Sequence, residues 1–183
     1  MTQTYPLHHE NLLRRYMAAV NTNVLVLLDP TDQHKRFEQI YDRQLFSRFT
    51  DKHRCVLHVM SSLQHVRFID FFIPHTEHSI VSARITLFKK TIFYIYCTNA
   101  ENIEEMRRRY NYPMFVKIFD VQWLATYLQH AALGYLIEHA QRAQYDLDEC
   151  DLALQQAAEM ANGLADELTA HMIVQTGTQP NDS

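Results

Sequence analysis

Glycine is scarce in this sequence. The 183 residues include only three glycines, Gly134, Gly163 and Gly177, and none precedes residue 134. A Walker phosphate loop or a dinucleotide-binding fingerprint needs glycines directly after an early strand, because only glycine lets backbone N–H groups close around a phosphate. A nucleophile elbow of the GxSxG type has the same requirement. The sequence therefore excludes all three motifs.

Cysteine is also rare, and its spacing is irregular. Cys55, Cys97 and Cys150 stand far apart, and no CxxC pair occurs. This pattern argues against a disulfide framework or a zinc finger, so we expect reduced thiols that pack as small hydrophobic side chains. One of the 11 histidines could serve Cys97 as a base. The apolar residues before Cys97 instead indicate a buried, inert thiol, and we expect no catalytic residue, metal or cofactor.

Long apolar runs are missing as well. No stretch approaches the roughly 18 apolar residues of a membrane span. The opening residues MTQTYPLHHENLLRRY do not join a basic stretch to an apolar one, as a secretory signal does. With 47% apolar and 11% aromatic residues, the chain can still bury a core. We expect a cytoplasmic protein without membrane contact, with the nucleus as the alternative.

Positive charge is absent from the C-terminal part of the chain. All 17 lysines and arginines lie at or before Arg142, whereas the residues from 144 onward hold eight of the 21 acids. Residues 1–143 therefore have a net charge of +4 and the remainder a net charge of −8. The two parts could attract one another, or the basic part could bind an acidic partner.

Apolar runs of strand length alternate with amphipathic segments along residues 22–143. The predicted strands are NVLVLLDP, RCVLHVMSS, TIFYIYC and MFVKIF, and the predicted helices cover residues 31–49, 99–110 and 121–133. Residues 63–73 could be helical or irregular, and 80–88 could form a strand or a short helix. This alternation predicts a doubly wound α/β fold, with a mostly parallel sheet of four to five strands in the flavodoxin or receiver manner.

Both ends of the chain differ from this pattern. Residues 1–21 are predicted to contain a short lead-in helix and 174–183 a disordered tail. Between them, residues 144–173 predict an acidic amphipathic helix of coiled-coil type. Its apolar seam, expected to bind a partner, comprises Leu154, Ala157, Ala161, Leu164 and Leu168. The alternative is that this seam packs on its own domain; Gly163 lowers helix stability by about 1 kcal/mol, so the helix needs packing either way.

Polar side chains follow three of the predicted strands. Ligands of doubly wound sheets bind at the carboxyl ends of the strands. The candidate ligand-binding residues there are Asp29, Ser61, Ser62, Thr98 and Asn99. Thr98 or Asn99 is also the natural cap of the helix that follows. These residues raise the alternative of an enzyme or a nucleotide or phosphate sensor.

Two further clusters have simpler explanations. His75 and His78, in HTEH, could begin a metal site, but a solvated loop after Pro74 is the preferred interpretation. The arginines at 107–109 could form a basic patch for nucleic acid. Glutamates one helical turn away pair with that charge, so we do not expect nucleic-acid binding.

Four segments carry a family resemblance: VLVLLD, VLHVMSS, TIFYIYCTNAENIEEMRRRY and VKIFDVQWLATYL, within residues 22–145. Together they resemble a receiver-like α/β accessory module of large invertebrate proteins that also carry ADP-ribosyltransferase or tetratricopeptide-repeat regions. The resemblance implies a module beside an effector domain and not an enzyme in its own right. Nothing in this chain is similar to the R, STS and ExE elements of the transferase.

Two other resemblances imply different sites. As in a response-regulator receiver, Asp29, Thr98 and Lys117 could stand where an acid, a hydroxyl and a lysine belong. No second acid adjoins Asp29, and one carboxylate holds a divalent cation weakly. The segment FVKIFDVQWLATYL is similar to part of a BRCT domain, which would place Trp123 in the core and imply phosphopeptide or partner binding. We therefore favour a non-catalytic module that binds a protein partner or itself.

Overall fold

The computed structural model describes residues 23–41, 43, 46–84, 88, 90–110, 116–143 and 146–176. The predicted lead-in helix at 1–21 and most of the predicted tail, residues 177–183, lie outside the described residues. The chain divides into two compact units, Met1–Ala125 and Thr126–Ser183. Each unit is described by itself below.

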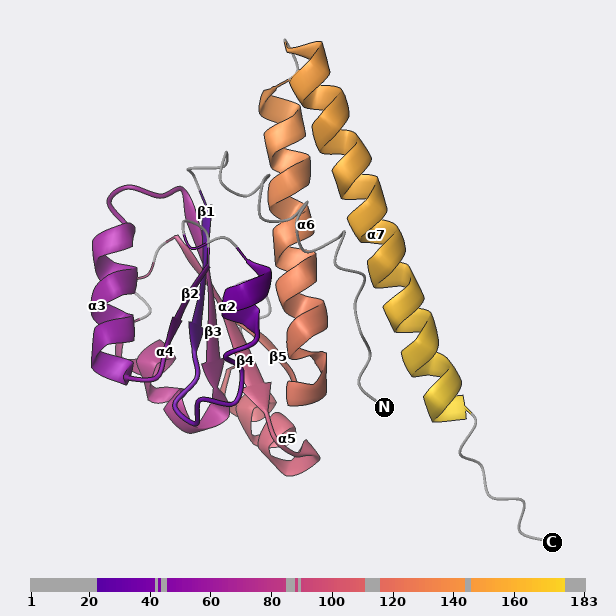
Figure 1. Ribbon diagram of the computed structural model, residues 1–183. Coiled ribbons are helices and arrows are strands. Elements are labelled where there is room, and N and C mark those ends of the chain that lie inside the picture. The colour runs from indigo at the N-terminus through magenta and orange to yellow at the C-terminus, as the bar shows by residue number, and fades with distance from the viewer. Residues whose placement is uncertain are drawn as a thin grey trace, which may run out of the picture. The chain divides into compact units, whose positions relative to one another are not determined.

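The first unit is built on one parallel sheet. Its strand order is β2-β1-β3-β4-β5, and every neighbouring pair is parallel. The direction of strand addition reverses between β1 and β3, as in flavodoxin-like sheets. The predicted doubly wound α/β fold is confirmed (Figure 1). The strands are β1 (Asn23–Leu28), β2 (Phe46–Phe49), β3 (Phe68–Pro74), β4 (Thr91–Cys97) and β5 (Val116–Asp120).

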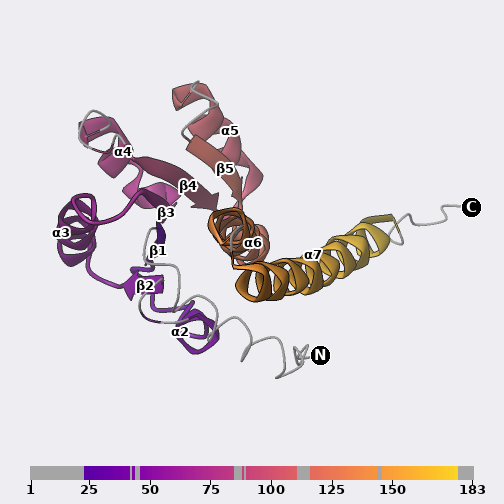
Figure 2. The same ribbon diagram turned by 90° about the horizontal axis from the view of Figure 1, so that it is seen from above.

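Short helices cover both faces of this sheet. Seen from above, α3, α4 and α5 lie on one face and α2 on the other (Figure 2). Two 3-10 turns, η1 (His75–Glu77) and η2 (Val121–Trp123), follow β3 and β5. The α-helices in the described residues of the unit are α2 (Phe37–Ile40), α3 (Lys52–Ser62), α4 (Ser79–Arg84) and α5 (Ala100–Arg109).

The α3, α4 and α5 face of the sheet carries a continuous hydrophobic core. Alternate residues of β1, β3 and β4 enter it, because side chains of a strand point to opposite faces in turn. The opposite residues of the same strands are buried too, so these strands are apolar on both faces. The core includes Val26 and Leu28 of β1, Phe71 and Ile73 of β3, Phe93, Ile95 and Cys97 of β4, Cys55 and Val59 of α3, Ile80 and Val81 of α4, and Met106 of α5.

Three predicted elements were misplaced. The segment RCVLHVMSS, predicted as a strand, forms α3 because Asp51 caps it, accepting a hydrogen bond from the backbone N–H of Arg54 at 2.7 Å. The third strand, Phe68–Pro74, lies in the stretch predicted to be helical or irregular. The long helix predicted over residues 31–49 is wrong, because α2 has four residues and β2 follows it.

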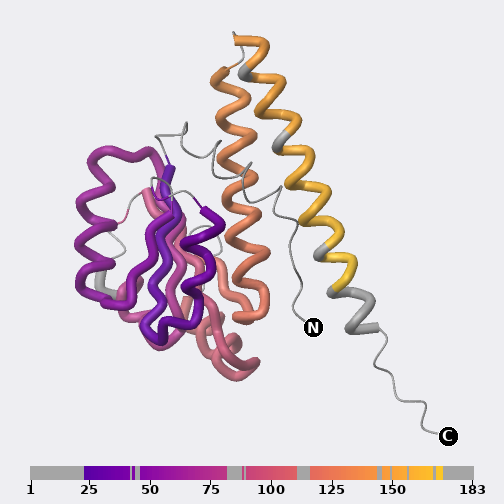
Figure 3. Tube along the Cα trace, in the orientation of Figure 1, coloured from indigo at the N-terminus to yellow at the C-terminus, as the bar shows by residue number. Residues whose placement is uncertain are grey.

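The described part of the second unit contains two helices. They are α6 (Leu124–Arg142), whose first two residues belong to the first unit, and α7 (Leu147–Thr176). At the turn, the backbone N–H of Asp146 donates to the carbonyl of Ala143 at 2.8 Å. The chain thereby reverses, and α6 and α7 run side by side in opposite directions near the turn (Figure 3). No helix in the described part of the chain combines the length and hydropathy of a membrane span.

Candidate functional site

Asp29 ends β1 and organises the loop that follows it. Its side chain is fully buried, at 0% exposure. The carboxylate accepts hydrogen bonds from the backbone N–H groups of Gln33 at 3.2 Å and His34 at 2.8 Å, and lies 3.4 Å from the Thr31 hydroxyl. Asp32 takes a left-handed conformation, with φ 56°, inside this loop. The Asp29 carboxylate thus holds the loop in its shape.

Arg48, from the neighbouring edge strand β2, completes this network. Its guanidinium lies 3.0 Å from the Asp29 carboxylate and 2.6 Å from that of Asp32, while its Nε donates to Glu38 at 2.9 Å. The Arg48 side chain is only 7% exposed. Asp29 therefore has a cation, two backbone donors and a hydroxyl around it within the chain. The Arg48 guanidinium is shared among three carboxylates, those of Asp29, Asp32 and Glu38.

Two rings close the other side of the Asp29 loop. His34 packs edge-on against Tyr96 at 5.8 Å and stacks with Phe37 at 6.0 Å. Burial lowers the pKa of His34, opposed by the charge of Asp29 and reinforced by Arg36 and Arg48. The Tyr96 hydroxyl donates to the carbonyl of Leu28 at 2.6 Å, and burial raises its pKa. Both side chains are therefore neutral near neutral pH.

Ser61 and Ser62 lie away from the other predicted strand-end residues. They end α3, which leads from the carboxyl end of β2 to the amino end of β3. Since all strands are parallel, both serines belong to the edge of the sheet opposite Asp29, Thr98 and Asn99. The Ser61 hydroxyl donates to the carbonyl of His58 at 2.9 Å, a local helix bond.

Thr98 and Asn99 are exposed at the end of β4. The Asn99 side chain accepts a hydrogen bond from the backbone N–H of Asn102 at 2.9 Å and so caps α5. The Asn102 amide lies 3.4 Å from the Thr98 hydroxyl. The preceding Cys97 is buried, and burial, with a smaller contribution from Asp120, raises its pKa to about 11. A thiol in this state is protonated and unreactive.

A second polar cluster lies at the carboxyl ends of the strands, and it was only partly predicted from the sequence. Lys52 pairs with Glu77 at 2.6 Å and donates to the Ser79 hydroxyl at 3.1 Å. The ring Nδ1 of His78 lies 2.8 Å from the Tyr110 hydroxyl, which also donates to the carbonyl of His78. These contacts tie α3, α4 and α5 together. Within the described residues, no group of three metal-ligating side chains gathers.

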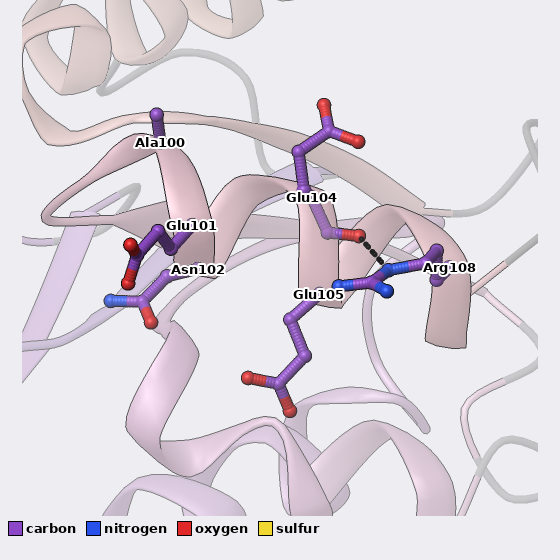
Figure 4. Close-up of a pocket in the computed structure, with 6 residues that line it drawn as sticks. All are labelled: Ala100, Glu101, Asn102, Glu104, Glu105 and Arg108. Atoms are coloured by element: carbon purple, nitrogen blue, oxygen red, sulfur yellow. Dashed lines mark hydrogen bonds between the residues drawn. The ribbon is translucent and has the colours of Figure 1, made fainter.

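A shallow depression runs along α5. All its lining residues come from this one helix: Ala100, Glu101, Asn102, Glu104, Glu105 and Arg108 (Figure 4). The Arg108 side chain turns back on its own helix, where its Nε donates to the carbonyl of Glu104 at 3.3 Å. Arg107 and Arg109 pair with Glu104 and Glu105, each at 3.5 Å. Glutamates of α5 thus partly neutralise the charges of Arg107 and Arg109.

The predicted seam of α7 divides into two stripes. Ala157 and Leu164 are buried, at 6% and 9% exposure, and with Ala153 at 0% they form an inner stripe. The other three seam residues, Leu154, Ala161 and Leu168, are exposed. They recur every seven residues, starting from Leu147. We call Leu147, Leu154, Ala161 and Leu168 the outer stripe.

Comparisons of this chain with models of protein families, with curated proteins and with solved structures found no match.

Proposed function

We propose that this protein is a non-catalytic interaction module that binds another polypeptide through α7. The observation that carries the proposal is the outer stripe. Leu147, Leu154 and Leu168 are 73%, 51% and 39% exposed, and Ala161 between them is exposed as well. A single exposed leucine is common on protein surfaces. Four apolar residues at seven-residue spacing on one 30-residue helix occupy one of the two apolar positions of the heptad repeat by which helices pair.

The contacts at the strand ends support a non-catalytic role. Asp29 is engaged by Arg48 and by two backbone N–H groups, so its carboxylate has a structural task. Asn99 caps α5, and the thiol of Cys97 is protonated. Nucleophilic catalysis requires a base within reach of a nucleophile, and none of these contacts joins such a pair.

The resemblance to receiver-like accessory modules agrees with this role. In the proposed role, the α/β unit carries α7, and α7 contacts the neighbouring polypeptide. A cytoplasmic or nuclear location suits reduced Cys55 and Cys97, both of which are buried free thiols.

Site-specific crosslinking in living cells tests the proposal. A photoreactive amino acid replaces Leu154 on the outer stripe or Leu152, which is two residues away on α7 and equally exposed, at 50%. Residues two apart on a helix point in different directions. We expect discrete crosslinked products of higher mass from position 154 and none from position 152. Absence of products at 154, or the same products at both positions, would contradict the proposal.

A further inference from the structure

We infer that the polypeptide bound by the outer stripe is a second copy of this chain, paired antiparallel through α7. This inference rests on the proposed function and names the partner. Two observations carry it: the order of the residues along the stripe and the positions of the acids around α7. A dimer with two-fold symmetry is the commonest oligomer of soluble proteins, and its interface requires a surface that is complementary to itself.

The order of residues along the outer stripe is symmetric about Ala161. Leu154 and Leu168 are 51% and 39% exposed, and each lies seven residues from Ala161. When a second copy of α7 is turned end for end about Ala161, its Leu168 lies level with Leu154, and the two Ala161 side chains face one another. The leucine contact is then made twice, as two-fold symmetry requires. The stripe is thus complementary to itself.

Small side chains occupy the middle of this surface. Ala158 and Ala165 are exposed and lie four residues after Leu154 and Ala161, which is the spacing of the second apolar position of a heptad repeat. With Ala161 they form a region of alanines between Leu154 and Leu168. In the antiparallel pair the alanine regions of both copies coincide, so the two helices can approach closely there. The leucines then pack at both ends of the contact.

Asp151 favours the antiparallel direction over the parallel one. It borders the outer stripe, because it lies four residues after Leu147 and three before Leu154. In a parallel pair the two Asp151 carboxylates would lie at the same level and repel one another. In an antiparallel pair centred on Ala161 they lie about 30 Å apart along the helix axis, at about 1.5 Å per residue. That separation is about three times the Debye length at physiological salt.

Two further acids of α7 point away from a helix bound to the outer stripe. At about 100° per residue, Glu159 and Asp166 lie roughly 160° round the helix from Ala161 and Leu168. A second copy seated on the stripe therefore does not bring these carboxylates together. The leucines can be buried by self-association without a charged partner.

Light scattering by the full chain over a range of concentrations measures the association. We expect a reversible dimer, because a contact made by one helix is small. Leu154→Asp is expected to raise the dissociation constant of the dimer by about tenfold or more, since the charge enters the interface twice. Leu152→Asp adds the same charge at a site that is 50% exposed and lies on the other side of α7. It is expected to leave the dissociation constant unchanged.

Mixtures of two variants test the direction of pairing. Leu154→Asp and Leu168→Lys are each expected to be monomeric at concentrations at which the original chain is dimeric. Their mixture is expected to form a heterodimer, because the introduced acid and base lie level with one another only in an antiparallel pair. The matched control mixes Leu154→Asp with Leu154→Lys, whose charges would meet only in a parallel pair. Recovery of the dimer in the first mixture alone cannot result from a loss of folding.

Four results would overturn the inference. They are a chain that stays monomeric at all concentrations, a dimer that Leu154→Asp weakens no more than Leu152→Asp does, recovery in the control mixture, and recovery in neither mixture. Crosslinking at Leu154 separates this failure from failure of the proposed function. If the chain is monomeric and position 154 crosslinks to a different protein, the interaction function stands and only the partner changes. If position 154 gives no product, the proposed function fails as well.

Discussion

The guanidinium of Arg48 lies 3.0 Å from the carboxylate of Asp29, and the two side chains are 7% and 0% exposed. The residues are 19 positions apart in the sequence and meet because β1 and β2 are parallel neighbours, with Leu28 opposite Phe49. A buried carboxylate at the end of a strand suggests chemistry at first sight. Here the pair joins two strand ends and a loop, which is a structural task.

Removal of the Asp29 carboxylate is expected to destabilise the fold. Asp29→Ala would leave Arg48 and two backbone N–H groups without this acceptor and lower the free energy of unfolding by about 3 kcal/mol. The control is Asp32→Asn, which keeps a residue that tolerates the left-handed conformation and removes a 57% exposed partner of the same guanidinium. It should cost less than about 1 kcal/mol. Urea unfolding compares them; equal losses would mean that burial of the pair contributes nothing.

Stability is expected to fall with acid partly through His34. Its pKa is lowered in the folded state below the ordinary 6.5 by burial, against the opposing charge of Asp29 and with smaller lowering effects of Arg36 and Arg48. The unfolded state therefore binds the proton more readily, and stability is lost as pH falls below 6.5 towards the folded pKa.

The substitution His34→Phe isolates this contribution. It retains a ring against Tyr96 and removes the titration, so the loss of unfolding free energy between about pH 7 and about pH 5 should become smaller. Urea unfolding at both pH values measures it. An unchanged slope in His34→Phe would show that His34 does not contribute.

Asn99 is expected to behave as a helix cap. Asn99→Ala should lower the free energy of unfolding by about 1 kcal/mol, since the backbone N–H of Asn102 loses its acceptor. Asn99→Asp should preserve stability, because a carboxylate caps equally well and favours the helix N-terminus. Thermal unfolding compares these with Thr98→Ala, expected within about 0.5 kcal/mol. A loss in Asn99→Asp as large as in Asn99→Ala would contradict the capping role.

Truncating a leucine of the inner stripe is expected to lower the free energy of unfolding more than truncating one of the outer stripe. Leu164→Ala removes a side chain that is 9% exposed and should cost about 2 kcal/mol through the cavity it leaves. Leu168→Ala truncates a leucine that is 39% exposed on the same helix and should cost less than about 0.5 kcal/mol. Helical circular dichroism followed in urea measures both. Similar losses would show that the outer stripe is covered within the chain.

The strands were predicted correctly where burial of both faces requires a continuous apolar run. β1 and β4 are continuous apolar runs because both of their faces are covered, and both were placed correctly. β2 is an edge strand with the polar residues Ser47 and Arg48 between Phe46 and Phe49, so it lacks such a run. The segment of α3 mixes valine, leucine and histidine, and a short apolar segment of this kind fits a helix or a strand equally well.

The sequence by itself determined the α/β alternation, the acidic C-terminal helix with its seven-residue apolar repeat, and a helix cap at Thr98 or Asn99, because each depends on residues close together in the chain. Only the tertiary structure decided the strand order, the pairing of Arg48 with Asp29, and the side of the sheet to which Ser61 and Ser62 belong. It also decided which leucines of α7 are buried. These features depend on contacts between segments that are distant in the sequence, and local periodicity does not predict such contacts.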